Sequence, residues 1–250
     1  MLTNNKKNDT YVNERENFLV ITAPNMSGKS TYIRQSALLL IQAFIGCFVP
    51  ATYASFRSTD RLFTRIGSED SLETNSSSFM VEMKEMSFIL HNCTSSSFII
   101  IDELGRSTGT SDAIGISWSI CEYLASIKCY VLFTTHYTQL TKLASTYPNI
   151  KNCHMVVSWN DGQDNKMQFA FKIANGCCPI ERYGIHAARM IGLPHSFTRR
   201  AQQVSDFLWE KEQKMQEQRD NAKASTQIAS KISTPTNLKF KIQKPSFELK

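Results

Sequence analysis

The chain has 250 residues, of which 42% are apolar, so it can bury the core of one sizeable domain with short appendages. Its seven cysteines are scattered and form no Cys-x-x-Cys pair, which excludes a disulfide framework and a cysteine zinc site and is typical of reduced thiols. The net charge is +6, and residues 211–250 hold +5 of it. This basic end is either a solvated tail or a contact for nucleic acid.

No part of the sequence predicts a membrane segment. The first seventeen residues are polar, so we expect no secretory signal, and residues 1–16 are predicted to be a flexible segment. The longest apolar stretch, 37–51, is interrupted by Gln42 and Gly46, whereas a membrane span needs about 20 apolar residues. We therefore expect this stretch to be a buried helix and expect no membrane partner.

Short apolar runs alternate with stretches of helical periodicity. In chain order, the patterns predict a strand at 17–22, a helix at 30–45, strand and loop over 53–78, a helix at 79–91, a strand at 97–101, a helix at 112–127, a strand at 129–134, a hairpin of 154–158 with 168–173, and helices from 183 that break at 192–194. The first helix is expected to bury a stripe of Ile33, Ala37, Leu38, Ile41 and Ile45. Such alternation predicts an α/β fold with a mostly parallel sheet covered by helices on both faces.

The stretch APNMSGKST lies between the first predicted strand and helix. A phosphate loop needs inward-pointing backbone N–H groups, a lysine for the β- and γ-phosphates and a hydroxyl for Mg²⁺. Gly28 allows a close backbone approach, Lys29 supplies the cation and Ser30 the hydroxyl, while the helix N-terminus attracts anions. The predicted nucleotide-binding residues are Ala23, Pro24, Asn25, Met26, Ser27, Gly28, Lys29, Ser30 and Thr31.

One residue of this stretch departs from the phosphate-loop pattern. Ala23 occupies the position at which the pattern has its first glycine. A methyl group is tolerated there if the backbone φ is negative. The consequence of this substitution therefore depends on the local backbone.

The ends of the next two strands supply further polar groups. The apolar run of FIIIDELGRST delivers Asp102 and Glu103. Asp102 is predicted to hold Mg²⁺ with Ser30, directly or through water, and Glu103 to polarise the attacking water. CYVLFTTH ends at His136, which can hydrogen-bond the γ-phosphate or that water. The predicted catalytic residues are Lys29, Glu103 and His136, with ATP and Mg²⁺ as cofactors.

Five segments together resemble the ATPase domain of the MutS family in their order and spacing. They are APNMSGKSTYIRQSALLLIQAFIGCFVPA, RLFTRIGSEDSLETNSSSFMVEMKEMSFILHN, FIIIDELGRST, FTTHYTQL and YGIHAARMIGLP. The resemblance covers about residues 17–210. NMSGKSTY, LFTRI, ETNSSSFM and EMKEM are most similar to the meiotic, crossover-promoting eukaryotic homologue, since mismatch-repair homologues usually have a glycine in place of Ser27. The resemblance implies a nuclear protein.

The resemblance also implies an ABC-type P-loop ATPase that dimerises head to tail. Each nucleotide is then closed over by a segment of the other subunit. That segment corresponds to NSSSFM, which places Ser77 on the partner's γ-phosphate, and it can also cap the helix that follows. LGRST resembles the loop that crosses to the partner's site, with Ser107 in place of the usual glycine. Ala23 and Ser107 bear on turnover more than on binding.

The segment YGIHAARMIGLPHSFTRRAQQVSDFL is compatible with a helix-turn-helix DNA reader. In the MutS family the corresponding unit packs against the partner ATPase domain, so we expect dimer contact, with Arg199 and Arg200 as surface charges. The predicted organisation is therefore a flexible segment (1–16), the ATPase domain (17–180), a helix-turn-helix dimer-contact element (181–210) and a basic, disordered tail (211–250).

These features predict a DNA-dependent ATPase that couples nucleotide-driven dimer closure to a DNA clamp in mismatch repair or meiotic recombination. The expected partners are another MutS homologue in a heterodimer and double-stranded DNA, contacted through segments outside this chain. One alternative is an ATP-regulated dimerisation module with little or no hydrolysis. Another is an ABC-type ATPase of a different complex, such as a transporter. The transporter signature Leu-Ser-Gly-Gly-Gln and the guanine-reading Asn-Lys-x-Asp motif are both absent.

Overall fold

The computed structural model describes residues 7–67, 78–160, 166–179, 183–211 and 214. The chain divides into two compact units, Met1–Met190 and Ile191–Lys250. The sequence predicted the main domain to end at residue 180. The first unit extends further because helix α5 (Tyr183–Met190) contacts strand β6 (Lys166–Asn175).

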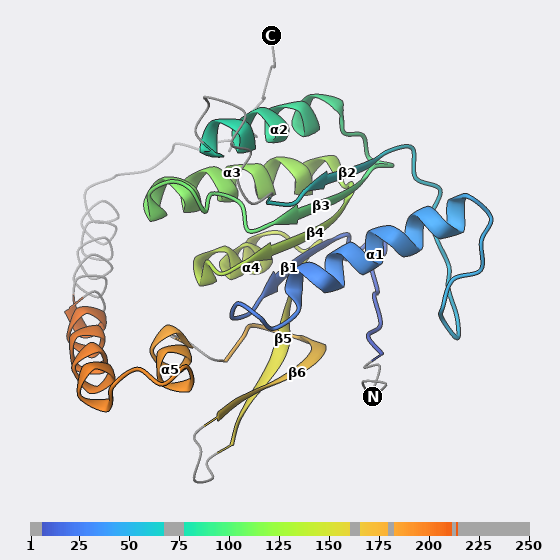
Figure 1. Ribbon diagram of the computed structural model, residues 1–250. Helices are drawn as coiled ribbons and strands as arrows, with labels where there is room; N and C mark the ends of the chain where they lie inside the picture. Colours follow the sequence, from blue (N-terminus) through green and yellow to red (C-terminus); the bar gives the residue numbers. More distant parts are fainter. Residues whose placement is uncertain (1–6, 68–77, 161–165, 180–182, 212–213, 215–250) are drawn as a thin grey trace, which may run out of the picture. The chain divides into compact units, whose positions relative to one another are not determined.

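A six-stranded sheet lies at the centre of the first unit, with the strand order β2-β3-β4-β1-β5-β6 (Figure 1). The other strands are β1 (Phe18–Thr22), β2 (Leu62–Arg65), β3 (Phe98–Asp102), β4 (Tyr130–Thr135) and β5 (Ile150–Asn160). Every neighbouring pair is parallel except β5 and β6, which form an antiparallel hairpin. The prediction of a mostly parallel sheet is confirmed.

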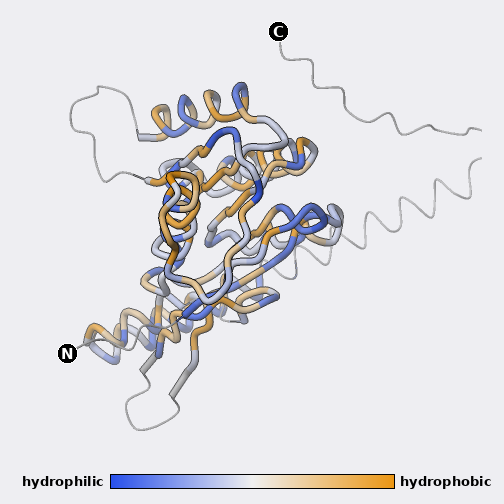
Figure 2. The backbone as a smooth tube through the Cα atoms, turned by 90° about the vertical axis from the view of Figure 1, so that its right-hand side faces the viewer, coloured by the Kyte–Doolittle hydropathy of each residue, from blue (hydrophilic) through white to orange (hydrophobic). Residues whose placement is uncertain are grey.

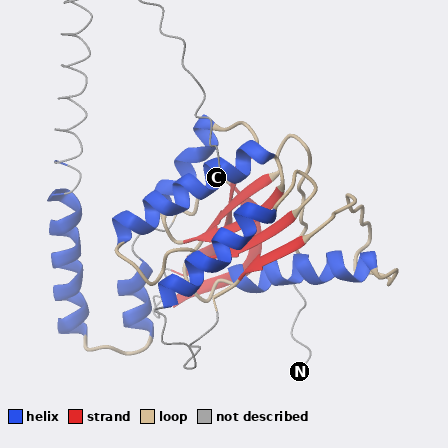
Figure 3. Cartoon of the chain, turned by 90° about the horizontal axis from the view of Figure 1, so that it is seen from above, coloured by secondary structure: helices blue, strands red, loops and turns tan. Residues whose placement is uncertain are grey.

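Helices cover both faces of this sheet (Figure 3). They are α1 (Lys29–Phe44), α2 (Ser78–Asn92), α3 (Thr110–Ile127) and the short α4 (Leu143–Thr146), with a 3-10 helix η1 (Thr138–Lys142) before α4. Hydrophobic and hydrophilic residues alternate along the helices (Figure 2), as expected of helices that bury one face.

The core consists of two layers because successive strand residues face opposite sides of the sheet. In β1, Phe18 and Val20 join the apolar cluster that includes residues of α2 and α3, whereas Leu19 and Ile21 join the cluster that includes residues of α1. The strand is buried on both faces, which explains why its sequence is a continuous apolar run and not an alternating one.

Helix α1 differs from its prediction in the residues that it buries. Ile33 and Ala37 are buried as expected, but Leu38, Ile41 and Ile45 are 61%, 43% and 69% exposed. Figures 1 and 3 show the C-terminal end of α1 running beyond the strands, so this end has no sheet to cover. The helix ends at Phe44, and the prediction of a buried helix over 37–51 is wrong.

The polar segment at the start of the chain was predicted to be flexible, but residues 7–16 are hydrogen-bonded to the sheet and to α1. The Asn8 amide donates to the carbonyl oxygen of Phe171 (2.8 Å) and accepts from the N–H of Ile173 (2.9 Å). Glu16 pairs with Lys151 at 2.8 Å. These contacts place the segment along β6 and β5.

In the second unit, residues 195–211 form a helix. The carbonyl oxygen of Pro194 accepts from the N–H groups of Phe197 (3.0 Å) and Thr198 (3.1 Å), so the helix begins directly after the predicted break. The helix-turn-helix arrangement and its role in dimer contact stay predictions. None of the helices in the described ranges is long and apolar enough to cross a membrane.

Candidate nucleotide site

The loop between β1 and α1 enters the helix through a glycine in a left-handed backbone conformation. Gly28 precedes α1 with φ 94° and ψ 13°, a left-handed conformation that favours glycine. Its position at the N-cap has no side-chain hydrogen bond, and the first turn of α1 contains no acidic residue. The first N–H groups of α1 are therefore uncapped by a side chain, and no acidic residue of the first helical turn competes for them, which favours an anion at this end.

Ala23 fits this loop without backbone strain. Among the non-glycine residues that the structure describes, positive φ occurs at Met26, Glu103, Lys128 and Phe171, so Ala23 has the negative φ that a methyl group tolerates. The residue is buried, and its carbonyl oxygen accepts a hydrogen bond from the loop's own lysine. Glycine is therefore not required at this position.

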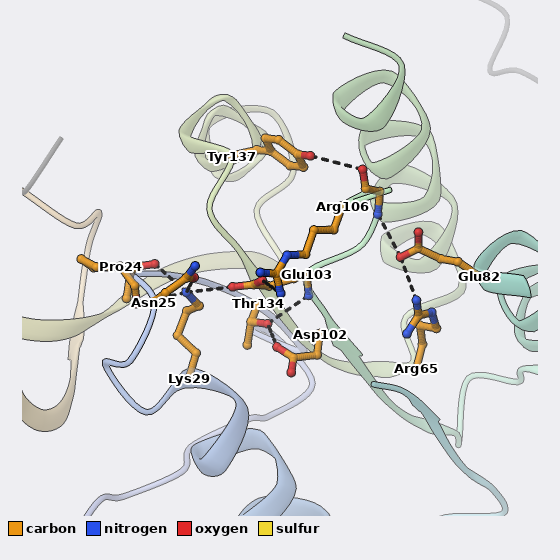
Figure 4. Close-up of polar contacts among 12 residues, drawn as sticks. Pro24, Asn25, Lys29, Arg65, Glu82, Asp102, Glu103, Arg106, Thr134 and Tyr137 are labelled. Carbon is orange, nitrogen blue, oxygen red and sulfur yellow. Dashed lines mark hydrogen bonds and ion pairs between the residues drawn. The ribbon is translucent and has the colours of Figure 1, made fainter. Parts of the chain in front are cut away.

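Lys29 is the central cation of the loop and is only 4% exposed. Its ammonium donates to the carbonyl oxygens of Ala23 (2.7 Å) and Pro24 (3.1 Å) and to Asn25 Oδ1 (3.5 Å), and it lies 3.1 Å from Glu103 Oε1. Figure 4 shows these groups converging from the loop and from the end of β3. A buried ammonium is stable only when it is paired in this way.

Ser27 has a different part in the loop. Its hydroxyl donates to the carbonyl oxygen of Pro24 at 2.7 Å, and the residue is 1% exposed. The Ser27 side chain is therefore part of the loop's own hydrogen bonding.

The acidic pair, Asp102 and Glu103, lies at the end of β3, beside β4. Asp102 pairs with Thr134 across the two strands, and the Thr134 hydroxyl donates to the Asp102 carboxylate. The N–H of Glu103 donates to the carbonyl oxygen of Thr134 at 3.1 Å. Glu103 has φ 48°, an uncommon conformation for a non-glycine residue that is often found at functional sites. Sequence reasoning missed Thr134, which lies one position before Thr135, the last residue of β4.

Two further charged groups border Glu103. Arg106 Nη1 lies 3.4 Å from Glu103 Oε2 and its side chain is 70% exposed. His136 is exposed and its ring centroid lies 4.1 Å from that of Tyr137. Partial desolvation lowers the pKa of His136, while Glu103 opposes this shift. The lowered pKa favours the neutral imidazole, which can both donate and accept a hydrogen bond.

Phe171 is a site residue that the sequence did not indicate. The register of the β5–β6 hairpin shifts between Met155 and Val157, and Phe171, opposite this irregularity, has φ 51°. Bulges of this kind redirect side chains. A Cβ atom added to Gly28 would lie 3.2 Å from Phe171 Cδ1, and the phenylalanine is 45% exposed. A half-exposed aromatic ring thus lies beside Gly28, at the start of α1.

The structure brings Lys29 and Glu103 into contact and places Asp102 next to Glu103, with Ser30 and Thr31 in the first turn of α1. Ser77 lies outside the described residues. In the described part of the chain, no cluster of three His, Cys, Asp or Glu side chains could hold a metal alone. A magnesium ion at Ser30 and Asp102 would therefore need water and phosphate oxygens as its other ligands, which is how Mg²⁺ is usually bound.

Comparison with known proteins identifies the family. Residues 19–209 match the family model described as MutS domain V. The chain is 45% identical over 207 residues to the DNA mismatch repair protein MSH4 of Arabidopsis thaliana, covering 83% of this chain and 26% of the relative. It is 46% identical over 201 residues to the human MutS protein homolog 4, covering 79% and 22%. It is 47% identical over 212 residues to the DNA mismatch repair protein MutS of Alkaliphilus oremlandii, covering 84% and 24%.

The chain thus spans about a quarter of the length of these curated relatives. Identity to the homologue-4 proteins and identity to the bacterial protein are nearly equal, so overall identity does not separate the two groups. The match to domain V covers β1 through to the helix of the second unit. The chain therefore belongs to the MutS family, as the resemblance predicted.

Proposed function

We propose that the first unit binds ATP at the loop of residues 23–31 and hydrolyses it. The observation that carries this proposal is the buried Lys29 ammonium, which lies at the N-terminus of α1 and 3.1 Å from Glu103 Oε1. Phosphate oxygens can take over the contacts that the ammonium makes with the loop carbonyl oxygens. The uncapped N–H groups of α1 would then face the same phosphates.

Each site residue has a role in this reaction, which transfers a phosphoryl group to water. Lys29 would neutralise charge on the β- and γ-phosphates, and Glu103 would polarise the attacking water. Ser30 and Asp102 would hold Mg²⁺, which when bound neutralises phosphate charge. Neutral His136 can accept a hydrogen bond from the water or donate one to the γ-phosphate. Thr134 orients Asp102 through the hydrogen bond that it donates.

The base of the nucleotide has a candidate contact in Phe171. Its ring is half-exposed beside Gly28, and a purine can stack on such a ring. The ring offers stacking without reading the base edge, so discrimination of adenine from guanine would come from other groups.

The wider role that we propose is nucleotide-driven closure of a dimer with another MutS homologue. Ser77 would reach the partner's γ-phosphate, and the helix-turn-helix element would contact the partner. Closure would act on double-stranded DNA through segments outside this chain, in a nucleus. The resemblance of NMSGKSTY, LFTRI, ETNSSSFM and EMKEM to the meiotic homologue favours meiotic recombination over mismatch repair. The alternative is a dimerisation module that binds ATP without cleaving it.

The test is equilibrium binding and single-turnover cleavage of ATP with Mg²⁺ by wild type, Lys29→Ala and Glu103→Gln. Loss of the buried ammonium is expected to weaken ATP binding at least about tenfold, because a charge-assisted hydrogen bond contributes about 1.5–3 kcal/mol. Glu103→Gln is expected to bind normally and to cleave about a hundredfold more slowly. Lys84→Ala, at an exposed position of α2, is the control and should match wild type.

Three outcomes separate the proposals, once thermal melting has shown that each variant is folded. Cleavage by wild type with the expected losses supports the enzyme. Binding by wild type without cleavage above the Glu103→Gln level supports the dimerisation module. A folded wild type that binds no nucleotide contradicts both.

A further inference from the structure

Glu82 is a buried carboxylate that the proposed reaction does not use. It lies on α2 and is 1% exposed. Its Oε1 atom accepts a hydrogen bond from the N–H of Gly105 at 3.0 Å and lies 3.0 Å from Arg65 Nη2 (Figure 4). Gly105 is two residues after Glu103, so a side chain from another helix is bonded to the turn that carries the proposed water-polarising group.

This turn is held in a single arrangement from several sides. Gly105 has φ +82°, and a Cβ atom added to it would lie 2.7 Å from the Cβ of Ala113. Its carbonyl oxygen accepts from the Tyr137 hydroxyl at 3.4 Å, while the N–H of Glu103 is bonded to Thr134 at 3.1 Å. Leu104, between the two, is fully buried. Of these contacts, the one from Glu82 holds the N–H of the Leu104–Gly105 peptide, the second peptide after Glu103.

Arg65 balances the charge of Glu82. Its side chain comes from β2, and its Nε atom lies 3.0 Å from Glu85 Oε2 without the alignment of a hydrogen bond. Glu85 is one turn further along α2, and its side chain is 48% exposed. It forms its ion pair with Arg65 and does not bond Gly105. Glu82 and Glu85 thus share the same cation, but only Glu82 reaches the turn.

We propose that Glu82 is a positioning residue, which holds the Gly105 peptide and thereby sets where the Glu103 carboxylate stands relative to the attacking water. This inference rests on the proposed ATP hydrolysis. A shift of the turn of about 1 Å can slow a reaction by up to a hundredfold without changing substrate binding, because only the geometry of the reacting groups is affected. Glu82 would therefore control cleavage and leave nucleotide affinity unchanged.

Two conservative variants separate the effect of the length of the Glu82 side chain from the effect of its charge. Glu82→Asp keeps the charge but shortens the side chain by one methylene group, so it withdraws from Gly105. Glu82→Gln keeps the length and an acceptor oxygen but loses the charge. If the residue acts by position, Glu82→Asp is expected to slow single-turnover ATP cleavage about tenfold with an unchanged Kd for ATP, and Glu82→Gln to stay within about threefold of wild type.

Glu85→Asp is the matched control, since it shortens a carboxylate beside the same arginine and does not contact the turn; it should cleave like wild type. Slower cleavage by Glu82→Gln than by Glu82→Asp would show that the carboxylate serves charge balance, and would overturn the inference. So would a Glu82→Asp protein that cleaves like wild type. A wild type that cleaves no ATP overturns the proposed function itself, together with this inference.

Discussion

At the scale of single residues, the site depends on backbone conformation as much as on side-chain type. Ala23 and Ser27 both stand where glycine would satisfy the usual pattern, yet neither has a positive φ. Gly28 does, and its missing Cβ leaves room for the ring of Phe171. The loop thus has a glycine at one of its two left-handed positions, Gly28, and a methionine at the other, Met26, whose φ is 65°.

Phe171 is expected to contribute to nucleotide affinity through stacking on the base. In Phe171→Ala, the Kd for ATP should rise about tenfold, because base–aromatic stacking contributes about 1–3 kcal/mol. Inorganic triphosphate, which has no base, should compete equally well for wild type and variant. Phe169→Ala is the control and should bind ATP like wild type. It removes a ring from the same strand, 6.1 Å from that of Phe171. An equal loss of affinity for triphosphate would contradict the stacking role.

At the scale of elements, replacing glycine by alanine is expected to have opposite effects on stability at two positions, one just before α3 and one within it. Gly105→Ala combines a positive φ with a Cβ overlap at 2.7 Å, so the free energy of unfolding should fall by about 1–3 kcal/mol. Gly115→Ala lies inside α3 with nothing within 4 Å of its added Cβ, so the free energy of unfolding should rise by up to about 1 kcal/mol. Urea denaturation of both variants measures these changes, and equal signs would contradict the described turn.

The sequence predicted most elements because apolar runs and helical spacing reflect burial directly. The strands β1, β3 and β4 and the helix α3 lie within two residues of their predicted ends. The buried face of α1 was predicted only in part, because periodicity cannot show how far a helix extends beyond its sheet. The short elements η1 and α4 were missed, since four or five residues carry no periodic signal.

At the scale of the whole molecule, the site is assembled by sheet topology. Because β1, β3 and β4 are parallel neighbours, the loop of residues 23–31, the acidic pair and His136 all lie at the carboxyl ends of these strands, at one edge of the sheet. These groups could be predicted from the sequence because each directly follows a strand. The roles of Phe171, Glu82 and Thr134 could not be predicted from the sequence. Phe171 is placed by an irregularity of the β5–β6 hairpin, Glu82 by its contact with the turn at Gly105, and Thr134 by the register of β3 and β4.

The division into two units leads to a last prediction. All residues of the candidate site that the structure describes belong to the unit Met1–Met190. A chain shortened to residues 1–190 is therefore expected to retain the nucleotide affinity of the full chain. ATP at a hundred times its Kd should stabilise both lengths by about 2.7 kcal/mol, because a ligand that binds only the folded state shifts the unfolding equilibrium by mass action.

Thermal melting with and without ATP and Mg²⁺ measures this stabilisation, and Lys29→Ala in both lengths is the control that should abolish it. If the shortened chain is folded but gains no stability from ATP, nucleotide binding needs residues beyond Met190. The site would then extend past the unit that contains its lysine and carboxylates. If both lengths gain equally, residues beyond Met190 are free to act in contact with a partner without entering the nucleotide site of their own chain.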